Sequence, residues 1–171
     1  MICSKVVPEI IAETGGTAVR TRVGHSFIKG LMAETGAVFG GEHSGHYYFR
    51  DNWRADSGMI AAVVVLAAMC SKGKALDELV APLRRHSASG EINTTVPDKD
   101  AVIAHIKSVY ADAELDELDG LTVDLGDWWF NLRGSNTEPL LRLNLEAATT
   151  DEVARRVEEV QGHMAATPAV A

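Results

Sequence analysis

The sequence has little cysteine and no cluster of basic residues. Cys3 and Cys70 are its two cysteines, which are too few for a disulfide framework, so a reducing cytoplasm is the expected compartment. The net charge is −8 and no Lys/Arg-rich run occurs, so neither nucleic acid nor an anionic membrane is expected as a partner. An acidic chain can still bind a small phosphorylated ligand, because local arginines and backbone N–H groups decide such binding.

Long apolar segments and targeting signals are also lacking. Residues 1–4 contain no basic stretch followed by a long apolar run, so they do not predict a signal peptide. The apolar run at residues 59–70 is too short to span a bilayer. With 171 residues, 46% of them hydrophobic, the chain can build one or two small domains with real cores.

The first half of the chain alternates between helical and extended patterns. We predict helices at residues 4–14, 27–34, 58–69 and 76–83, and strands at 17–22, 37–39 and 47–49. The helix at 58–69 is apolar on all sides, so a sheet or other helices must cover it. This alternation predicts a layered α/β domain over residues 1–85, and because the segment opens directly on a helix, the first strand of the domain is expected to be missing.

The second half follows a different pattern. Residues 86–90 are small and polar and are predicted to be a linker. The predicted elements beyond it are strands at 91–96, 121–125, 128–133 and 140–145 and helices at 98–110 and 150–164. Residues 91–165 are therefore expected to form a small α+β domain with a four-stranded, mainly antiparallel sheet and two helices, followed by a tail at 166–171. The acidic stretch at 112–119 is predicted to be a solvated loop.

The loop at residues 133–139 (Arg-Gly-Ser-Asn-Thr-Glu-Pro) lies between two predicted strands. It offers a guanidinium group, two hydroxyls, a side-chain amide and several backbone N–H groups. Arg133 can donate two parallel charge-assisted hydrogen bonds to a phosphate, and a curled backbone can form an anion-binding nest. The alternative interpretation is an ordinary polar hairpin turn with an arginine on the surface.

The loop at residues 40–46 (Gly-Gly-Glu-His-Ser-Gly-His) also lies between predicted strands. Glu42 and Ser44 are two residues apart, so in extended backbone they point the same way and can bind adjacent hydroxyls of a sugar. One alternative is a metal site made by Glu42, His43 and His46. The other is a structural turn with incidental histidines.

Three further positions carry polar groups next to predicted helices. His25 lies where a predicted strand leads into a helix, an edge at which α/β proteins bind ligands and at which helix N–H groups attract anions; the alternative is a simple turn residue. Asp56 or Ser57 is predicted to cap the helix at 58–69. Arg84 and Arg85 are predicted to be a solvated pair near a helix end.

The two loops together resemble motifs of the α-D-phosphohexomutases, and most of all those of the bacterial phosphomannomutase/phosphoglucomutase type. The motifs are residues 41–46 (Gly-Glu-His-Ser-Gly-His) and, further along the chain, residues 133–139. Members of that family have four domains, of which the third carries a sugar-binding loop and the fourth a phosphate-binding loop. The resemblance covers essentially the whole chain and implies that it is the C-terminal half of such an enzyme.

The resemblance also implies roles for single residues. His25 matches a histidine that reaches the substrate near the transferring phosphoryl group and is the implied catalytic residue. The implied substrate-binding residues are Glu42 and Ser44, which would contact the O3 and O4 hydroxyls, with His46 and Lys29. The implied residues for the non-transferring phosphate are Arg133, Ser135, Asn136, Thr137 and Arg142.

The implied activity is that of an intramolecular phosphotransferase. It interconverts hexose 1-phosphate and hexose 6-phosphate, of mannose or glucose, through a phosphoserine enzyme and a hexose 1,6-bisphosphate intermediate, with Mg²⁺ as cofactor. This sequence contains neither a phosphoserine loop nor an Asp-Gly-Asp run for the metal, so both are expected in a missing N-terminal half. No metal site is expected in this chain, and the chain alone is expected to be inactive.

Two other functions stay open at this point. A non-catalytic module that binds sugar phosphates would need the same two loops. A fragment of phosphoglucosamine mutase is the other alternative, although that enzyme usually carries Gln at the position of His43. Glu42 and Ser44 would contact hydroxyls common to mannose and glucose phosphates, so the loop does not choose between these substrates.

Overall fold

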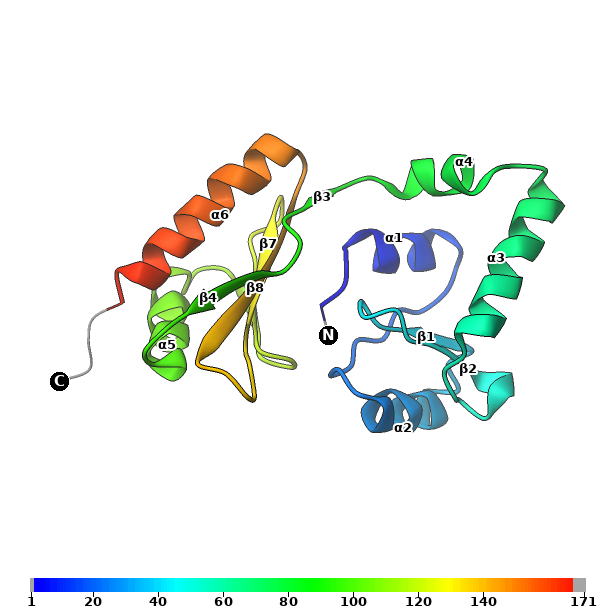
Figure 1. The fold of residues 1–171 in the computed structure, drawn as a ribbon, viewed down its shortest axis with the longest axis horizontal. Helices are drawn as coiled ribbons and strands as arrows, with labels where there is room; N and C mark the ends of the chain where they lie inside the picture. Colours follow the sequence, from blue (N-terminus) through cyan, green and yellow to red (C-terminus); the bar gives the residue numbers. More distant parts are fainter. Residues whose placement is uncertain (1, 168–171) are drawn as a thin grey trace. The chain divides into compact units, whose positions relative to one another are not determined.

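The computed structural model describes residues 2–167, which fall into two compact units, Met1–Arg85 and His86–Ala171 (Figure 1). Met1 and residues 168–171, which make up most of the predicted tail, lie outside the described residues. The first unit mixes helices with a short two-stranded sheet. The second unit is built on one larger antiparallel sheet.

The described elements of the first unit follow the predicted order. They are α1 (Val6–Glu13), α2 (His25–Thr35), β1 (Phe39–Gly41), β2 (Tyr47–Phe49), η1 (Arg50–Asn52), α3 (Gly58–Lys72), α4 (Leu76–Val80) and η2 (Ala81–Leu83). β1 and β2 pair in antiparallel register, with Phe39 opposite Phe49. The predicted helices are confirmed, and the strand predicted at 37–39 begins two residues later than expected.

Contact between α2 and the hairpin forms the core of the first unit. Ile28 and Met32, one helical turn apart, are buried together with Tyr48 of β2. A Cβ atom at Gly40 would come within 3.1 Å of Ile28 and 3.2 Å of Met32, so glycine lets β1 lie directly on the helix. The same contact brings His25, the first residue of α2, to a ring-centroid distance of 5.5 Å from Tyr48.

Residues 17–22 form no strand in the described chain, so that prediction is wrong. A strand needs a neighbour that completes its ladder of hydrogen bonds. The described sheet of this unit consists of β1 and β2, which pair with each other. The segment therefore runs without regular structure to α2, although its alternating pattern suits a strand.

Helix α3 is well capped but poorly covered. Ser57 is its N-cap, and the Ser57 Oγ accepts a hydrogen bond from the Ile60 N–H at 3.2 Å. None of the α3 residues is buried within the described chain; Met59 is 84% exposed and Leu66 is 57% exposed. The expectation that other elements cover this helix is not met within residues 2–167.

No single helix of the described chain is long and apolar enough to cross a bilayer. The pair Gly58–Lys72 and Leu76–Leu83 passes by length and composition when taken together, but its two parts are bent by 91°.

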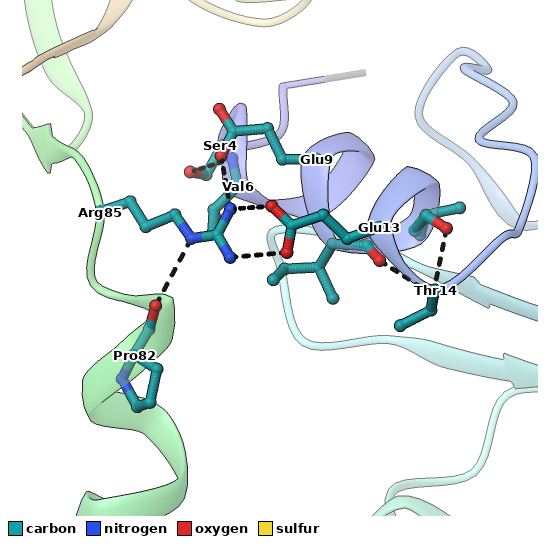
Figure 2. Close-up of polar contacts among 9 residues, drawn as sticks. Ser4, Val6, Glu9, Glu13, Thr14, Pro82 and Arg85 are labelled. Atoms are coloured by element: carbon teal, nitrogen blue, oxygen red, sulfur yellow. Dashed lines mark hydrogen bonds and ion pairs between the residues drawn. The ribbon is translucent and has the colours of Figure 1, made fainter.

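Arg85 ties the end of the first unit to its first helix (Figure 2). Its guanidinium donates to both carboxylate oxygens of Glu13, at 2.5 and 2.8 Å, and to Glu9 at 3.2 Å. Arg84 pairs separately with Asp77 at 2.7 Å. Both arginines are exposed, as predicted for a solvated pair, but Arg85 also makes a two-pronged ion pair that joins α1 to the chain beyond η2.

The second unit is an antiparallel sheet covered by two helices on one face (Figure 1). Its elements are β3 (Ser87–Ala88), β4 (Ile92–Thr95), α5 (Lys99–Val109), β5 (Glu114–Asp116), β6 (Leu121–Asp124), β7 (Trp129–Gly134), β8 (Leu140–Ala147) and α6 (Thr150–Ala165). The strand order is β3-β8-β7-β6-β5, and β4 also pairs with β8. Every strand pair is antiparallel.

Alternating side chains of the central strands make the core of this unit. Phe130 and Leu132 of β7 and Leu143 of β8 are fully buried, as is Ile106 of α5. Because successive strand residues point to opposite faces, the residues between them lie on the other side of the sheet. That face carries Asn131 and its cross-strand partner Asn144, with Arg133 and Arg142 next along the strands.

The sheet has six strands, whereas four were predicted. Ser87–Ala88, within the predicted linker at 86–90, forms β3 on β8. Glu114–Asp116, within the stretch predicted to be a solvated loop, forms β5 on β6. Both additions are short edge strands with a polar sequence, so hydrophobic periodicity gives no signal for them. The expected class, a small α+β domain with a mainly antiparallel sheet and two helices, is confirmed.

Candidate functional site

The hairpin loop in the first unit is a tight turn. The Glu42 C=O accepts a hydrogen bond from the Gly45 N–H at 3.0 Å, and the Glu42 N–H donates to the His46 C=O at 2.9 Å. Glu42 is buried while Ser44 is exposed. The premise of extended backbone is therefore wrong here: the turn sends the Glu42 carboxylate inward and the Ser44 hydroxyl to the surface.

The carboxylate of Glu42 is held by a buried tyrosine. Tyr48 Oη donates a hydrogen bond to Glu42 Oε1. Burial, reinforced by this hydrogen bond, raises the pKa of Tyr48 well above its ordinary value, so the phenol stays a donor across the physiological range. Within the described residues Tyr48 is the sole side-chain partner of Glu42, so the other carboxylate oxygen can accept a hydrogen bond from a ligand hydroxyl.

Two histidines and an aspartate meet beside this carboxylate. His46 Nδ1 lies 2.9 Å from Asp56 Oδ2, and His25 Nδ1 lies 3.7 Å from Asp56 Oδ1. The two imidazole rings are 4.7 Å apart in an edge-to-face arrangement. The hydrogen bond with His46, helped by the charge of His25, lowers the pKa of Asp56, so Asp56 is a carboxylate at neutral pH.

The Asp56 carboxylate fixes what the His46 ring can do. Because a carboxylate only accepts hydrogen bonds, Nδ1 of His46 is the donor to Asp56, which leaves Nε2 for another contact. Asp56 reaches this place through an isolated β-bridge to Tyr48. Of the two residues predicted to cap α3, Ser57 is the cap and Asp56 is not. Spacing in the sequence does not show the bridge that places Asp56 beside the two histidines.

The remaining positions of this loop region are exposed. Lys29 lies one helical turn beyond His25, on the same side of α2, and makes no hydrogen bond or ion pair among residues 2–167. His43 lies at the tip of the turn. Across the described chain no group of three or more His, Cys, Asp or Glu side chains is arranged to hold a metal ion, so the structure gives no support to a metal site at Glu42, His43 and His46.

The loop at residues 133–139 joins β7 to β8 in the second unit. Ser135 is buried, and its Oγ accepts hydrogen bonds from the N–H groups of Thr137 at 3.4 Å and Glu138 at 3.2 Å. The Ser135 N–H donates to the Leu140 C=O at 2.9 Å. The serine hydroxyl therefore curls the loop, while Asn136 and Thr137 present their side chains to solvent.

Two arginines face each other across the strands at the base of this loop. Arg133 and Arg142 are direct cross-strand partners, so they lie on the same face of the sheet. Each arginine has one carboxylate at ion-pair distance: Arg133 Nη1 is 3.8 Å from Asp119 Oδ2, and Arg142 Nη1 is 3.7 Å from Glu91 Oε2. Arg142 Nε is buried without a hydrogen-bond partner among the described residues. Like charges in this position repel, and an anion between them would relieve the repulsion.

Lys99, the first residue of α5, contributes to the same loop from the helix-covered face of the sheet. Its Nζ donates hydrogen bonds to the backbone oxygens of Ser135 at 2.7 Å and Glu138 at 3.3 Å. Nothing in the sequence near Lys99 predicts this contact, because the loop lies 36 residues further along the chain. Each predicted loop residue otherwise lies in or next to its own loop, and the two loops belong to separate units.

The chain belongs to the phosphoglucomutase/phosphomannomutase family. Residues 1–86 match its domain III, described as an alpha/beta/alpha domain, and residues 91–163 match its C-terminal domain. The resemblance seen in the two loop motifs is thereby confirmed over nearly the whole chain.

Individual relatives agree with this family. The chain is 46% identical over 163 residues to a phosphomannomutase of Methanocaldococcus jannaschii, which covers 95% of this chain and 36% of that protein. It is 46% identical over 141 residues to phosphohexose mutases of Xanthomonas campestris pv. campestris, covering 81% of this chain and 32% of theirs. The chain therefore spans about a third of the length of these relatives.

A solved structure shows the same fold. It is a phosphoglucomutase/phosphomannomutase family protein from Burkholderia thailandensis, with a TM-score of 0.82 at 29% sequence identity. The superposition covers 99% of this chain and 37% of that one. The α/β unit followed by a small α+β unit is thus the arrangement of domains found in this family.

Proposed function

We propose that this chain is the sugar- and phosphate-binding part of a phosphomannomutase/phosphoglucomutase that interconverts hexose 1-phosphate and hexose 6-phosphate. The relatives that carry the name phosphomannomutase or phosphohexose mutase support this activity for the whole protein. In this proposal a phosphoserine and a hexose 1,6-bisphosphate intermediate carry the phosphoryl group, and the protein acts in the cytoplasm in carbohydrate metabolism.

The observation that carries the proposal is the cluster of Glu42, His46 and Asp56 beside His25. Glu42, with one oxygen held by Tyr48, accepts a hydrogen bond from a sugar hydroxyl through the other. His46, held at Nδ1 by Asp56, accepts a proton at Nε2 from the hydroxyl that receives the phosphoryl group. His25 lies at the N-terminus of α2, where it can contact the same group.

The arginine loop supplies the second half of the proposal. Arg133 and Arg142 bind the phosphate that is not transferred, together with the exposed side chains of Asn136 and Thr137. Ser135, whose Oγ already holds the loop, acts by shaping it. In this proposal one loop binds the sugar hydroxyls and the other binds the phosphate. The substrate can therefore bind in either of two orientations.

The Mg²⁺ ion that this reaction uses is expected to bind outside this chain. No group of three His, Cys, Asp or Glu side chains within the described residues fits a metal ion. In this proposal the residues described here bind the substrate, orient it and accept a proton from it. Loss of the proton from the attacking hydroxyl is the step in which they take part directly.

Isothermal titration of the 171-residue chain tests the proposal. We expect mannose 1-phosphate and glucose 1-phosphate to bind, and free mannose to bind at least tenfold more weakly. Arg133→Ala should weaken the phosphosugars about tenfold to a hundredfold, since it removes a charge-assisted contact, and leave free mannose unchanged. Glucosamine 6-phosphate as a further ligand tests the phosphoglucosamine alternative.

Two outcomes would overturn the proposal. Equal affinity for mannose and its phosphate would show that no phosphate site exists in this chain. The second outcome is phosphosugar binding by this chain together with no mutase activity in the full-length protein that contains it. That result would favour the non-catalytic sugar-phosphate module instead.

A further inference from the structure

The position of Lys99 is unusual for a lysine at a helix start. Lys99 is the first residue of α5, and Asp98 caps the helix by accepting hydrogen bonds from the N–H groups of Asp100 and Ala101, each at 3.0 Å. The N-terminus of a helix carries partial positive charge, so a cation there is unfavourable for the helix. A residue that opposes its local element usually serves something else, and here its contacts lead to the loop at residues 133–139.

The Lys99 side chain contacts that loop from the helix-covered face of the sheet. Its stem lies against Gly134, where a Cβ atom would be 3.4 Å from Lys99 Cδ. Its ammonium group donates to the carbonyl oxygens of Ser135 and Glu138. An ammonium group has three N–H donors, so one donor is left after these two hydrogen bonds.

These bonds set the direction of the backbone donors in the loop. In a trans peptide the C=O and the following N–H point in opposite directions, and no cis peptide bond occurs among the described residues. Since the Ser135 carbonyl points to Lys99, the Asn136 N–H points away from it. Within residues 2–167 that N–H makes no hydrogen bond, whereas the N–H groups of Thr137 and Glu138 are held by Ser135 Oγ.

We infer that Lys99 is a positioning residue of the phosphate site. It turns the Ser135 carbonyl away from the ligand, directs the Asn136 N–H toward it, and brings a positive charge to a loop whose carbonyl oxygens would otherwise repel an anion. The phosphate therefore meets the Asn136 amide and the arginines on one side of the loop, with Lys99 behind. This inference rests on the proposed function, in which the loop binds the non-transferring phosphate of a hexose phosphate.

The test uses the 171-residue chain with mannose 1-phosphate as the probe. Lys99→Met keeps the length of the stem and removes the charge and both hydrogen bonds; we expect about tenfold weaker binding, the size of one lost charge-assisted contact. Lys107→Met is the matched control, because Lys107 lies in the last turn of the same helix and pairs with Glu117 away from the loop. It removes the same charge and should change the affinity less than twofold.

A second measurement separates positioning from bulk charge. In ¹⁵N-labelled protein the Asn136 amide resonance should move when mannose 1-phosphate is added, and this shift should be lost in Lys99→Met and recovered in Lys99→Arg. The Thr137 and Glu138 amides should also exchange with solvent faster in Lys99→Met. If Lys99→Met does not fold, Lys99→Arg decides: affinity within about threefold of the wild type supports the inference, and a tenfold loss overturns it.

The failures are distinguishable. Wild-type affinity in Lys99→Met, with binding weakened in Arg133→Ala, overturns the role of Lys99 and leaves the proposed function intact. Absence of mannose 1-phosphate binding in the wild-type chain overturns the proposed function, and the inference falls with it.

Discussion

The two units hold their loops in different ways. The loop at residues 133–139 connects two long central strands above a continuous core, in which residues such as Phe130 and Leu143 are fully buried. The loop at residues 40–46 connects two three-residue strands, and the buried core beneath it consists of Ile28, Met32 and Tyr48. The loop at residues 40–46 therefore depends on its own polar contacts, whereas the loop at residues 133–139 is supported by the sheet and its core.

This difference predicts where each site is vulnerable. Burial of apolar surface supplies most of the stability of a folded unit, so the second unit should tolerate changes in its polar contacts. In the first unit the contacts Tyr48–Glu42 and His46–Asp56 hold the hairpin and also orient side chains of the proposed binding site. A change there should alter folding and binding together.

The largest effect is expected for Leu143→Ala in the second unit. Leu143 is fully buried at the centre of the sheet, and truncation of such a leucine costs about 3 kcal/mol in the free energy of unfolding. Urea unfolding followed by tryptophan fluorescence measures this, because Trp128 and Trp129 are buried in the second unit. Met32→Ala in the first unit should leave that transition unchanged; an equal shift of it would show that the two units unfold as one and would break the comparison.

A smaller effect is expected for Tyr48→Phe in the first unit. The change removes the donor to Glu42 and leaves a buried carboxylate oxygen without its partner, which costs about 2 kcal/mol. Amide hydrogen exchange of residues 42–48 should become faster, and phosphosugar affinity should fall with it. Tyr47→Phe is the control, because Tyr47 is exposed on the same strand. Unchanged exchange in Tyr48→Phe would mean that the polar contact does not hold the hairpin.

A still smaller effect is expected at the N-cap of α3, a helix of the first unit with no buried residue in the described chain. Ser57→Ala removes the hydrogen bond to the Ile60 N–H and should cost about 1 kcal/mol. Because no residue of α3 is buried in the described chain, the loss should appear as faster amide exchange in the first turn of the helix. Ser71→Ala, near the other end of α3, should not change that turn. The same protection in both variants would contradict the role of the cap.

Local patterns predicted much of this molecule. Helices α5 and α6, the strands β6 to β8 and both loops follow from hydrophobic periodicity and from Gly-rich or polar breaks. The side chains of Arg133 and Arg142 lie on one face because of their strand register.

The failures share one physical cause, which is dependence on distant partners. Residues 17–22 have a strand pattern, yet a strand exists only where a neighbour completes its ladder. Asp56 joins the histidines through a bridge to Tyr48, and Lys99 reaches a loop that lies far along the chain. None of these partners lies within the window in which periodicity is read.

The smallest effect concerns the ion pair that replaces core packing for α1. The hydrogen bond from Arg85 lowers the pKa of Glu13 below its ordinary value. A carboxylate with a lowered folded-state pKa stabilises the folded form fully above the unfolded-state pKa, about 4.3 for glutamate, and this contribution disappears as the pH falls through the folded-state pKa.

Glu13→Gln should therefore lower the Tm of the first unit slightly at pH 7, and the difference from the wild type should shrink as the pH falls through the folded-state pKa of Glu13. Glu34→Gln is the matched control, because Glu34 is an exposed helix residue without a hydrogen bond or ion pair among residues 2–167. Exposed ion pairs contribute little to stability. A large drop in Tm at pH 7 would therefore mean that the Arg85–Glu13 pair stabilises the first unit as strongly as buried leucines stabilise the second. A difference that did not shrink with falling pH would show that Glu13 acts through packing rather than through its charge.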